Sequence, residues 1–178
     1  GQTYQTVPIG SQCWMKENLN IGEMLLNTQP SLNNNVIEKY CYDNDPSNCD
    51  TYGGLYKWDE LMGYSTLEGV QGICPDGWHV PTDTEWNTLE GEADSQFPVD
   101  DPIWLETGRR GFDAGGNLKM QGITLWSPPN DGATNSTGFT ALPGGNMSSG
   151  GGFGNMGPYS YHWTSTETNA YSANYHRY

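Results

Sequence analysis

Basic residues are scarce in this chain of 178 residues, where seven Lys and Arg stand against 21 Asp and Glu and the formal net charge is −14. Binding to nucleic acid depends on clustered Lys and Arg at the phosphates, so a nucleic-acid partner is not expected. Long apolar runs are also missing, and no stretch approaches the roughly 18 apolar residues of a membrane span. We therefore expect a soluble domain with no direct membrane insertion.

Leu, Ile and Val are absent from the last part of the chain, because none of them follows Leu142. The tail is instead rich in Tyr, Asn, Ser and Gly, with two His and a single Trp. It is therefore disordered, covered by another element, or a surface that contacts a partner. The alternating stretches "YSYHWTSTE" and "NAYSANYHRY" predict two strands in a hairpin, with its turn near Glu167 to Asn169.

The composition of these two strands is typical of a recognition surface. Tyr supplies a large contact area at low entropic cost, while Ser and Asn adapt their hydrogen bonds. Alternation along a strand places one set of side chains inside and the other outside. The alternative is that the aromatic side chains form core and the rest is solvated sheet, and we expect this for Trp163. The residues expected to contact a ligand are Tyr159, Tyr161, His162, Tyr171, Ser172, Asn174, Tyr175, His176 and Tyr178.

Aromatic residues make up 12% of the chain and include seven Trp, which argues against disorder. The length fits one domain over residues 1–178. A short helix is expected near residues 55–62, where Leu55, Trp58 and Leu61 recur at helical spacing. The aromatic scaffold is expected to consist of Trp58, Trp78, Trp86, Phe139 and Trp163.

The segment "WHVPTDTEWNTLE" carries the clearest local signal. Thr82 is followed three residues later by Glu85, which is the pattern of a capping box at a helix N-terminus. Trp86 and Leu89 then form an apolar stripe. These features predict a helix over residues 83–93.

The four cysteines are Cys13, Cys41, Cys49 and Cys74. An even number in a loop-rich, acidic chain favours an oxidising compartment. Cys41 with Cys49 closes a short loop and is the first pairing expected, and Cys13 with Cys74 would follow. The alternative for the second pair is that one or both are buried free thiols.

Signals for metal binding or catalysis are few. Asp43, Asp45, Ser47 and Asp50 lie close together as calcium ligands do, but the Gly and the late Glu of a helix–loop–helix calcium site are missing. A plain turn is the main interpretation and calcium the alternative. We expect His79 to be packed or hydrogen-bonded, and we expect no catalytic residue, because neither a nucleophile motif nor a phosphate-binding motif occurs.

Several segments together resemble one known family. "VPIGSQCWMKENLNIG", "YCYDNDPSNCDTYGGLYKWDELM", "GICPDGWHVPTDTEWNTLE", "GFTALPGG" and "YHWTSTE" resemble, in this order, the Fibrobacter succinogenes major paralogous domain. "CPDGWHVPTDTEW" is also similar to the formylglycine-generating-enzyme branch of the C-type lectin fold. The resemblance implies an α+β, C-type lectin-like fold with a small twisted antiparallel sheet, long irregular loops, and the segments near 55–62 and 83–93 as its helix pair.

The resemblance also has implications for function. The family occurs on microbial surface proteins, and some members are similar to variable proteins of diversity-generating retroelements, which makes residues 142–178 a candidate variable region. Family members usually continue to a last strand whose cysteine would pair with Cys74, and the partner of Cys74 therefore stays open. The late cysteine pair that holds copper in the enzyme branch is absent, and so are the sugar-binding triplets of calcium lectins.

We therefore expect a non-enzymatic recognition domain, extracellular or at the cell surface, that binds a protein or another macromolecule through its C-terminal face. One alternative is a structural surface or pilus-tip module whose tail packs on a neighbouring subunit. The other is an enzyme related to the formylglycine generator, with a polar pocket centred on His79.

Overall fold

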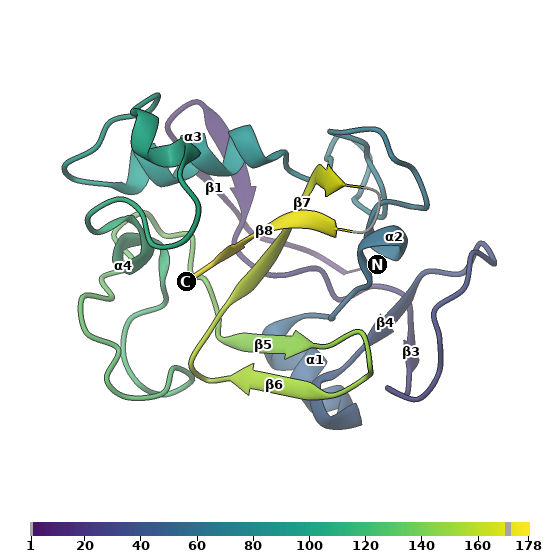
Figure 1. Cartoon of the computed structure of the whole chain (residues 1–178). Coiled ribbons are helices and arrows are strands. Elements are labelled where there is room, and N and C mark those ends of the chain that lie inside the picture. The colour runs from purple at the N-terminus through teal and green to yellow at the C-terminus, as the bar shows by residue number, and fades with distance from the viewer. Residues whose placement is uncertain (1, 170–171) are drawn as a thin grey trace.

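The structure, a computed structural model, describes residues 2–169 and 172–178. Within these residues the fold mixes α-helices with four small, separate two-stranded sheets. The pairs are antiparallel except for the second, which is parallel (Figure 1). They are β1 (Thr6–Ile9) with β2 (Gln12–Met15), β3 (Glu23–Leu25) with β4 (Glu38–Tyr40), β5 (Gly144–Met147) with β6 (Phe153–Met156), and β7 (Tyr161–Asn169) with β8 (Ser172–Arg177).

The longest helix is α3, which runs from Asp83 to Ala93 as predicted. The Thr82 hydroxyl accepts a hydrogen bond from the Glu85 backbone N–H at 3.1 Å, and the Glu85 carboxylate accepts one from the Thr82 N–H at 2.8 Å. This reciprocal pair is the predicted capping box. The stripe is also confirmed, because Trp86 and Leu89 are buried.

The hydrophobic core lies between α3 and the segments around it. Trp14 of β2 and Phe139 pack against the Trp86 ring, with centroids 4.8 and 5.8 Å away. Trp104 and Leu118 complete the buried cluster. Aromatic rings therefore supply much of this packing, beside aliphatic residues such as Leu89 and Leu118.

The second predicted helix is shorter than expected. Helix α2 spans only Trp58–Leu61, because Leu55 is extended and forms a bridge with Tyr40 through two backbone hydrogen bonds of 2.8 and 2.9 Å. The remaining helices are α1 (Pro46–Tyr52) and α4 (Ala114–Leu118), with 3-10 turns η1 (Tyr42–Asn44) and η2 (Pro102–Leu105). No helix in the described residues is long and apolar enough to cross a membrane.

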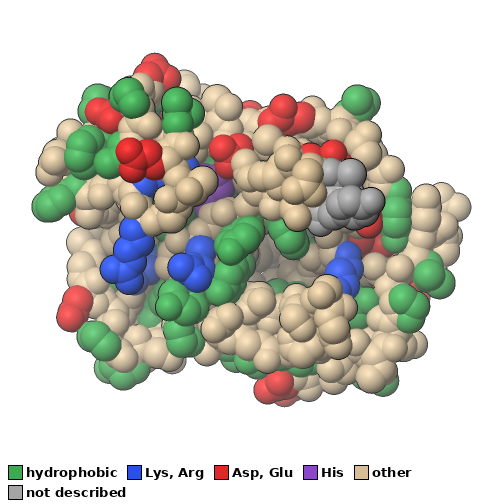
Figure 2. All heavy atoms as spheres, viewed as in Figure 1, with side chains coloured by type: hydrophobic (Ala, Val, Ile, Leu, Met, Phe, Trp, Pro, Cys, Tyr) green, Lys and Arg blue, Asp and Glu red, His purple; other side chains and the backbone are tan. Residues whose placement is uncertain are grey.

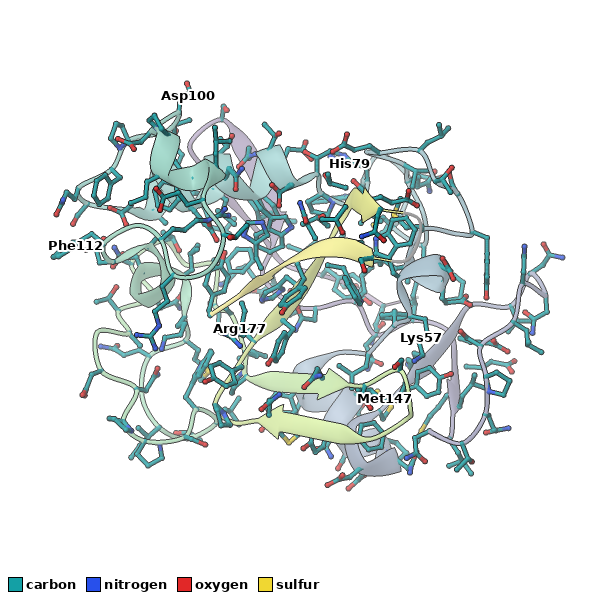
Figure 3. All side chains as sticks on the ribbon, viewed as in Figure 1. Lys57, His79, Asp100, Phe112, Met147 and Arg177 are labelled. Atoms are coloured by element: carbon teal, nitrogen blue, oxygen red, sulfur yellow. A yellow bond between two sulfur atoms is a disulfide. The ribbon has the colours of Figure 1, made fainter. Side chains whose placement is uncertain are left out.

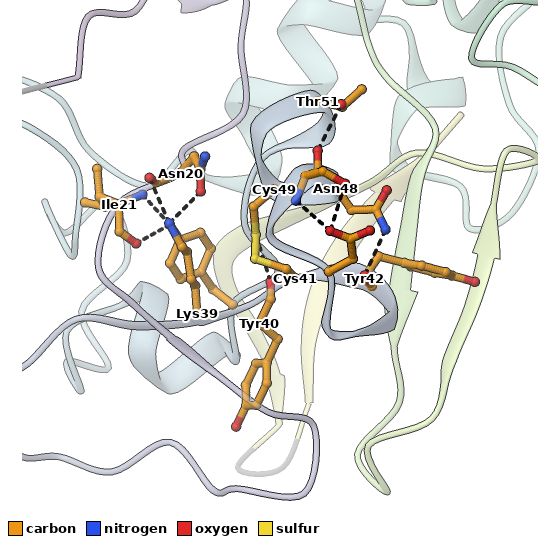
Figure 4. The surroundings of a disulfide bond; sticks show 12 residues. Asn20, Ile21, Lys39, Tyr40, Cys41, Tyr42, Asn48, Cys49 and Thr51 are labelled. Atoms are coloured by element: carbon orange, nitrogen blue, oxygen red, sulfur yellow. Dashed lines mark hydrogen bonds between the residues drawn. A yellow bond between two sulfur atoms is a disulfide. The ribbon is translucent and has the colours of Figure 1, made fainter.

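Cys41 and Cys49 form the predicted disulfide beside η1 and α1 (Figure 4). Asp45 lies between η1 and α1 and is the N-cap of α1. Its side chain accepts a hydrogen bond from the Ser47 N–H at 2.9 Å. The second predicted disulfide is wrong, because Cys13 and Cys74 are both free.

Candidate functional site

The two faces of the β7–β8 hairpin have different surroundings. Tyr161 is paired with Arg177 and Trp163 with Tyr175, so these four side chains share one face. The pair His162 and His176 lies between them and points to the opposite face. The predicted hairpin is therefore present, although Glu167 and Asn169 still belong to β7 and not to the turn. Tyr171 lies outside the described residues.

One face of the hairpin carries a row of solvent-exposed rings. Tyr159, Trp163 and Tyr175 are 37%, 38% and 55% exposed. Neighbouring centroids lie 5.8 Å apart for Tyr161 and Tyr175 and 6.3 Å apart for Trp163 and Tyr175. The Arg177 guanidinium lies 4.6 Å from the Tyr159 centroid, a cation–π distance. We call this surface the aromatic face, and its members are Tyr159, Tyr161, Trp163, Tyr175 and Arg177.

The expectation that Trp163 is buried was wrong. Its register places it opposite Tyr175 on the exposed face. Its indole N–H donates to the Tyr56 carbonyl at 3.1 Å, which holds the ring without burying it. The Trp58 indole N–H donates to the Thr164 carbonyl at 2.8 Å. Two indoles thus fix β7 to the segment around α2.

The expectation that His176 is exposed was also wrong, because only 5% of this residue is accessible. Its Nδ1 lies 2.7 Å from Glu90 Oε1 and its Nε2 lies 3.2 Å from Asp83 Oδ1. Its ring stacks on Trp86 at 5.2 Å, with 17° between the planes. The polar residue is buried because α3 supplies two carboxylates that it can reach.

Two further residues complete the network around Glu90. Arg110 approaches Glu90 Oε2 at 2.8 Å, and Tyr178 donates its hydroxyl to Glu90 Oε1 at 3.2 Å. Charged Arg110 and His176 then face two carboxylates, Glu90 and Asp83, so the buried charges balance. Tyr178 is therefore an anchor of the tail, and the expectation that it contacts a ligand is not supported by its position.

The pKa values reflect this balance. Burial raises the pKa of Glu90, but hydrogen bonds and charge from His176 and Arg110 outweigh it and the net pKa is lowered. The hydrogen bond from His176 lowers the pKa of Asp83. Burial lowers the pKa of His176, but the hydrogen bonds to Asp83 and Glu90 outweigh it and raise the pKa overall. The two carboxylates thus favour the charged form of His176.

His162, across the strand from His176, is held neutral. Its ring lies 5.1 Å from Trp86 and 5.9 Å from Phe139, and its Nε2 lies 2.6 Å from the Ser160 hydroxyl. Burial and the charge of His176 lower its pKa to about 3. His162 therefore lies on the packed face of the hairpin, although it was expected to contact a ligand.

The other predicted contact residues have mixed positions. Ser172 is exposed at the start of β8, while Asn174 is half-buried and hydrogen-bonds Asp83. Of the predicted set, Tyr159, Tyr161 and Tyr175 are the members of the aromatic face. Sequence reasoning missed Trp163 and Arg177, although Arg177 carried a signal as the sole basic residue after Lys119.

The aromatic face borders a cleft of about 1450 Å³. Figure 2 shows hydrophobic side chains around a hollow in the middle of this surface, and Figure 3 places Arg177 on one side of it and Lys57 and Met147 on the other. β2, β5 and β7 all contribute to its lining. A second hollow of about 510 Å³ shares Lys57 and Met147 with it, so the depression is elongated.

The residues considered for metal binding or catalysis, Asp43, Asp45, Ser47, Asp50 and His79, have defined places in the structure. The described residues contain no group of three or more His, Cys, Asp or Glu that could hold a metal ion. Asp45 is the N-cap of α1, and Ser47 and Asp50 lie within that helix, so the expectation of a plain turn was wrong for this part of the segment. His79 is hydrogen-bonded, as expected, with its Nε2 2.9 Å from Glu85 Oε1.

Comparison with known proteins gives one match. No curated protein and no solved structure matches this chain. The family model of the Fibrobacter succinogenes major domain matches residues 7–178. Because this match spans nearly the whole sequence, the chain belongs to the Fibrobacter succinogenes major domain family.

Proposed function

We propose that this domain is a non-enzymatic recognition module that binds a macromolecular ligand, a protein or another surface polymer, through the aromatic face. The observation that carries the proposal is the row of exposed rings on one face of β7–β8. Exposed aromatic side chains gathered with an Arg are typical of interaction sites, because they supply contact area and cation–π or hydrogen-bonding partners.

The opposite face of the hairpin supports this proposal. His176 and Tyr178 bind Glu90, and Trp58 binds the Thr164 carbonyl, so the strands are fixed before a ligand arrives. A fixed surface loses little conformational entropy on binding. The rings of the aromatic face can therefore contribute most of their contact free energy to affinity.

The finer proposal is that the fold is C-type lectin-like and that the tail is diversified between gene copies. The separation of packed and exposed positions along β7 and β8 supports the diversification, because exposed positions can change without loss of the core. A ligand on another cell or particle then implies an extracellular or cell-surface location, which the Cys41–Cys49 disulfide also favours.

Binding screens with matched variants test the proposed function. The domain is screened against arrays of surface proteins and polysaccharides as wild type and as the triple variant Tyr161→Ser, Trp163→Ser, Tyr175→Ser. The control variant Leu105→Ser, Phe112→Ser removes exposed apolar side chains elsewhere. We expect the triple variant to lose roughly 100-fold or more in affinity, since each anchor contributes on the order of 1 kcal/mol or more. Binding that survives the triple variant but not the control variant would contradict the proposal.

A further inference from the structure

Aromatic side chains line the cleft both at its floor and at its rim. On the floor, the rings of Trp14 and Phe139 lie 4.8 and 5.8 Å from the buried Trp86 ring. At the rim, the exposed rings of Trp163 and Tyr175 meet edge to face, with centroids 6.3 Å apart and planes at 84°. Most of the tryptophans of the chain take part, and those that line the cleft are Trp14, Trp58, Trp78, Trp86 and Trp163.

Two of these indoles are fixed to the scaffold by hydrogen bonds. The Trp58 N–H donates to the Thr164 carbonyl at 2.8 Å. The Trp163 N–H donates to the Tyr56 carbonyl at 3.1 Å. A ring that is fixed before a ligand arrives loses little conformational entropy on binding. Their faces are therefore available for stacking at low entropic cost.

The indole N–H of Trp86 differs, because it is buried and has no acceptor. Trp86 is 4% exposed and lines the cleft, and its N–H has no hydrogen-bond partner among the described residues. Buried Trp N–H groups nearly always find a partner. An oxygen atom of a ligand in the cleft would supply the missing acceptor.

The charged groups of the cleft have both signs. Asp59, Glu167 and Lys57 line it, and none of the three is in an ion pair among the described residues. The carboxylates of Glu17 and Glu85, which also line it, accept hydrogen bonds from within the chain. A polyanion would meet the free carboxylates and a polycation the ammonium group, and such like-charge contacts cost affinity. Hydroxyl groups can both donate to a carboxylate and accept from an ammonium group, so an uncharged, hydroxyl-rich ligand fits both.

We propose that the cleft binds a neutral polysaccharide, which rests on the proposed function and names the chemical class of its ligand. The apolar faces of the sugar rings would stack on the aromatic rings of the rim. Sugar hydroxyl groups would donate to Asp59 and Glu167. Sugar oxygen atoms would accept from Lys57 and from the Trp86 indole N–H.

The shape of the depression suits a chain of several sugar units. The cleft and the second hollow share Lys57 and Met147, so a ligand can continue from one into the other. An apolar peptide fits less well, because it would leave the carboxylates and the ammonium group of the cleft without partners. All the contacts are made by side chains, so binding needs no metal ion.

NMR signals of the indole N–H groups test this inference, because the chain has tryptophans inside and outside the cleft. Trp104 and Trp126 are buried and do not line it, so their signals are internal controls. The ¹⁵N-labelled full chain is titrated, in the presence of EDTA, with hexasaccharides of β-1,4-glucose, α-1,4-glucose, xylose, mannose and N-acetylglucosamine. We expect at least one of them to shift the signals of Trp86 and Trp163 and to leave those of Trp104 and Trp126 in place.

Three results of this titration would overturn the inference. The first is that no hexasaccharide shifts the signals of the cleft tryptophans. The second is that Trp104 and Trp126 shift equally with them. The third is that only a galacturonic acid hexamer, which is anionic, produces the shifts.

Single variants test whether the cleft itself is the site. Trp78→Ala removes a half-buried ring that lines the cleft and is not a member of the aromatic face. It should weaken binding of the hexasaccharide by roughly tenfold, while Trp78→Phe, which keeps a ring, should retain most of the affinity. The control Phe112→Ala removes an exposed ring away from the cleft (Figure 3) and should change affinity less than about threefold. Equal effects of Trp78→Ala and Phe112→Ala, in variants that unfold at the same temperature as the wild type, would overturn the inference.

Failure of this inference can be told apart from failure of the proposed function. A protein ligand that is lost in the triple variant of the aromatic face, together with no response to any hexasaccharide, would overturn the polysaccharide ligand. The same result would leave the aromatic face as a binding surface.

Discussion

At the residue scale, the pKa values of the two histidines of the hairpin are shifted in opposite directions although the residues are cross-strand neighbours. His176 faces two carboxylates and Arg110, while His162 faces aromatic rings and a hydroxyl. The pKa of one is raised and that of the other is lowered. Their contributions to stability should therefore depend on pH in different ranges.

His162 should control the acid side of the stability profile. Its pKa is about 3 in the folded chain and near 6.5 when unfolded, so unfolding takes up a proton between these values and stability falls as pH decreases. The variant His162→Gln should lower the slope of unfolding free energy against pH by up to about 1.4 kcal/mol per pH unit in this range. Urea unfolding at several pH values measures it. An unchanged slope would mean that His162 is not neutral in the fold.

His176 should control the neutral to alkaline side. Because its folded pKa is raised, its contribution is fully present below pH 6.5 and is lost as pH rises through the folded value. The contribution of His176 to wild-type stability should therefore fall as pH rises above about 6.5, and this fall should be absent in His176→Gln. NMR titration of the imidazole gives the pKa directly, and a value below 6.5 would disprove the charged state.

At the scale of elements, the sequence predicted best those helices and strands whose signals lie within a few residues of one another. Helix α3 was predicted at its observed bounds, because Thr82 and Glu85 define its start within one turn and Trp86 with Leu89 defines its buried side. The segment near 55–62 failed because a partner distant in sequence, Tyr40, holds Leu55 in an extended conformation. β5 and β6 were not expected as strands, because Gly, Ser and Asn give no period-2 pattern of apolar residues.

The two faces of the hairpin could not be assigned from the sequence. Alternation separates the side chains into two sets, but the choice of the buried set depends on Glu90 and Arg110, which lie far away in the chain. His176 was therefore expected outside and Trp163 inside, and both expectations were wrong. Tyr175, which was expected to contact a ligand, is 55% exposed, and its ligand contact stays a prediction.

The capping box of α3 allows a stability prediction at this scale. The variant Thr82→Ala removes the hydroxyl that accepts the Glu85 N–H, and should lower the free energy of unfolding by about 1 kcal/mol. Thr84→Ala changes an exposed position of the same helix and should have an effect within about 0.5 kcal/mol. Thermal and urea unfolding of the pair measure the difference. Equal effects would show that the cap adds nothing to helix stability.

At the scale of the whole molecule, the packed network around Glu90 and the aromatic face lie on opposite faces of the same hairpin. Glu90 and Arg110 hold one face of the hairpin through His176, and the exposed rings lie on the other face. The acidic surface, with a net charge of −14, contains two cations beside this region, Lys57 and Arg177, which have no acidic partner among the described ion pairs. A ligand with negative or hydrogen-bond-accepting groups fits such a surface.

The measurement that tests the central claim most directly is sequencing of the 3′ end of this gene from many cells of its source population. The account predicts substitutions at the aromatic face, at Tyr159, Tyr161, Trp163, Tyr175 and Arg177, while the packed positions His162, His176 and Tyr178 stay constant. Variation would then alternate along each strand. Substitutions that fall equally on packed and exposed positions, or a tail as constant as "CPDGWHVPTDTEW", would contradict the claim that this face is a diversified binding surface.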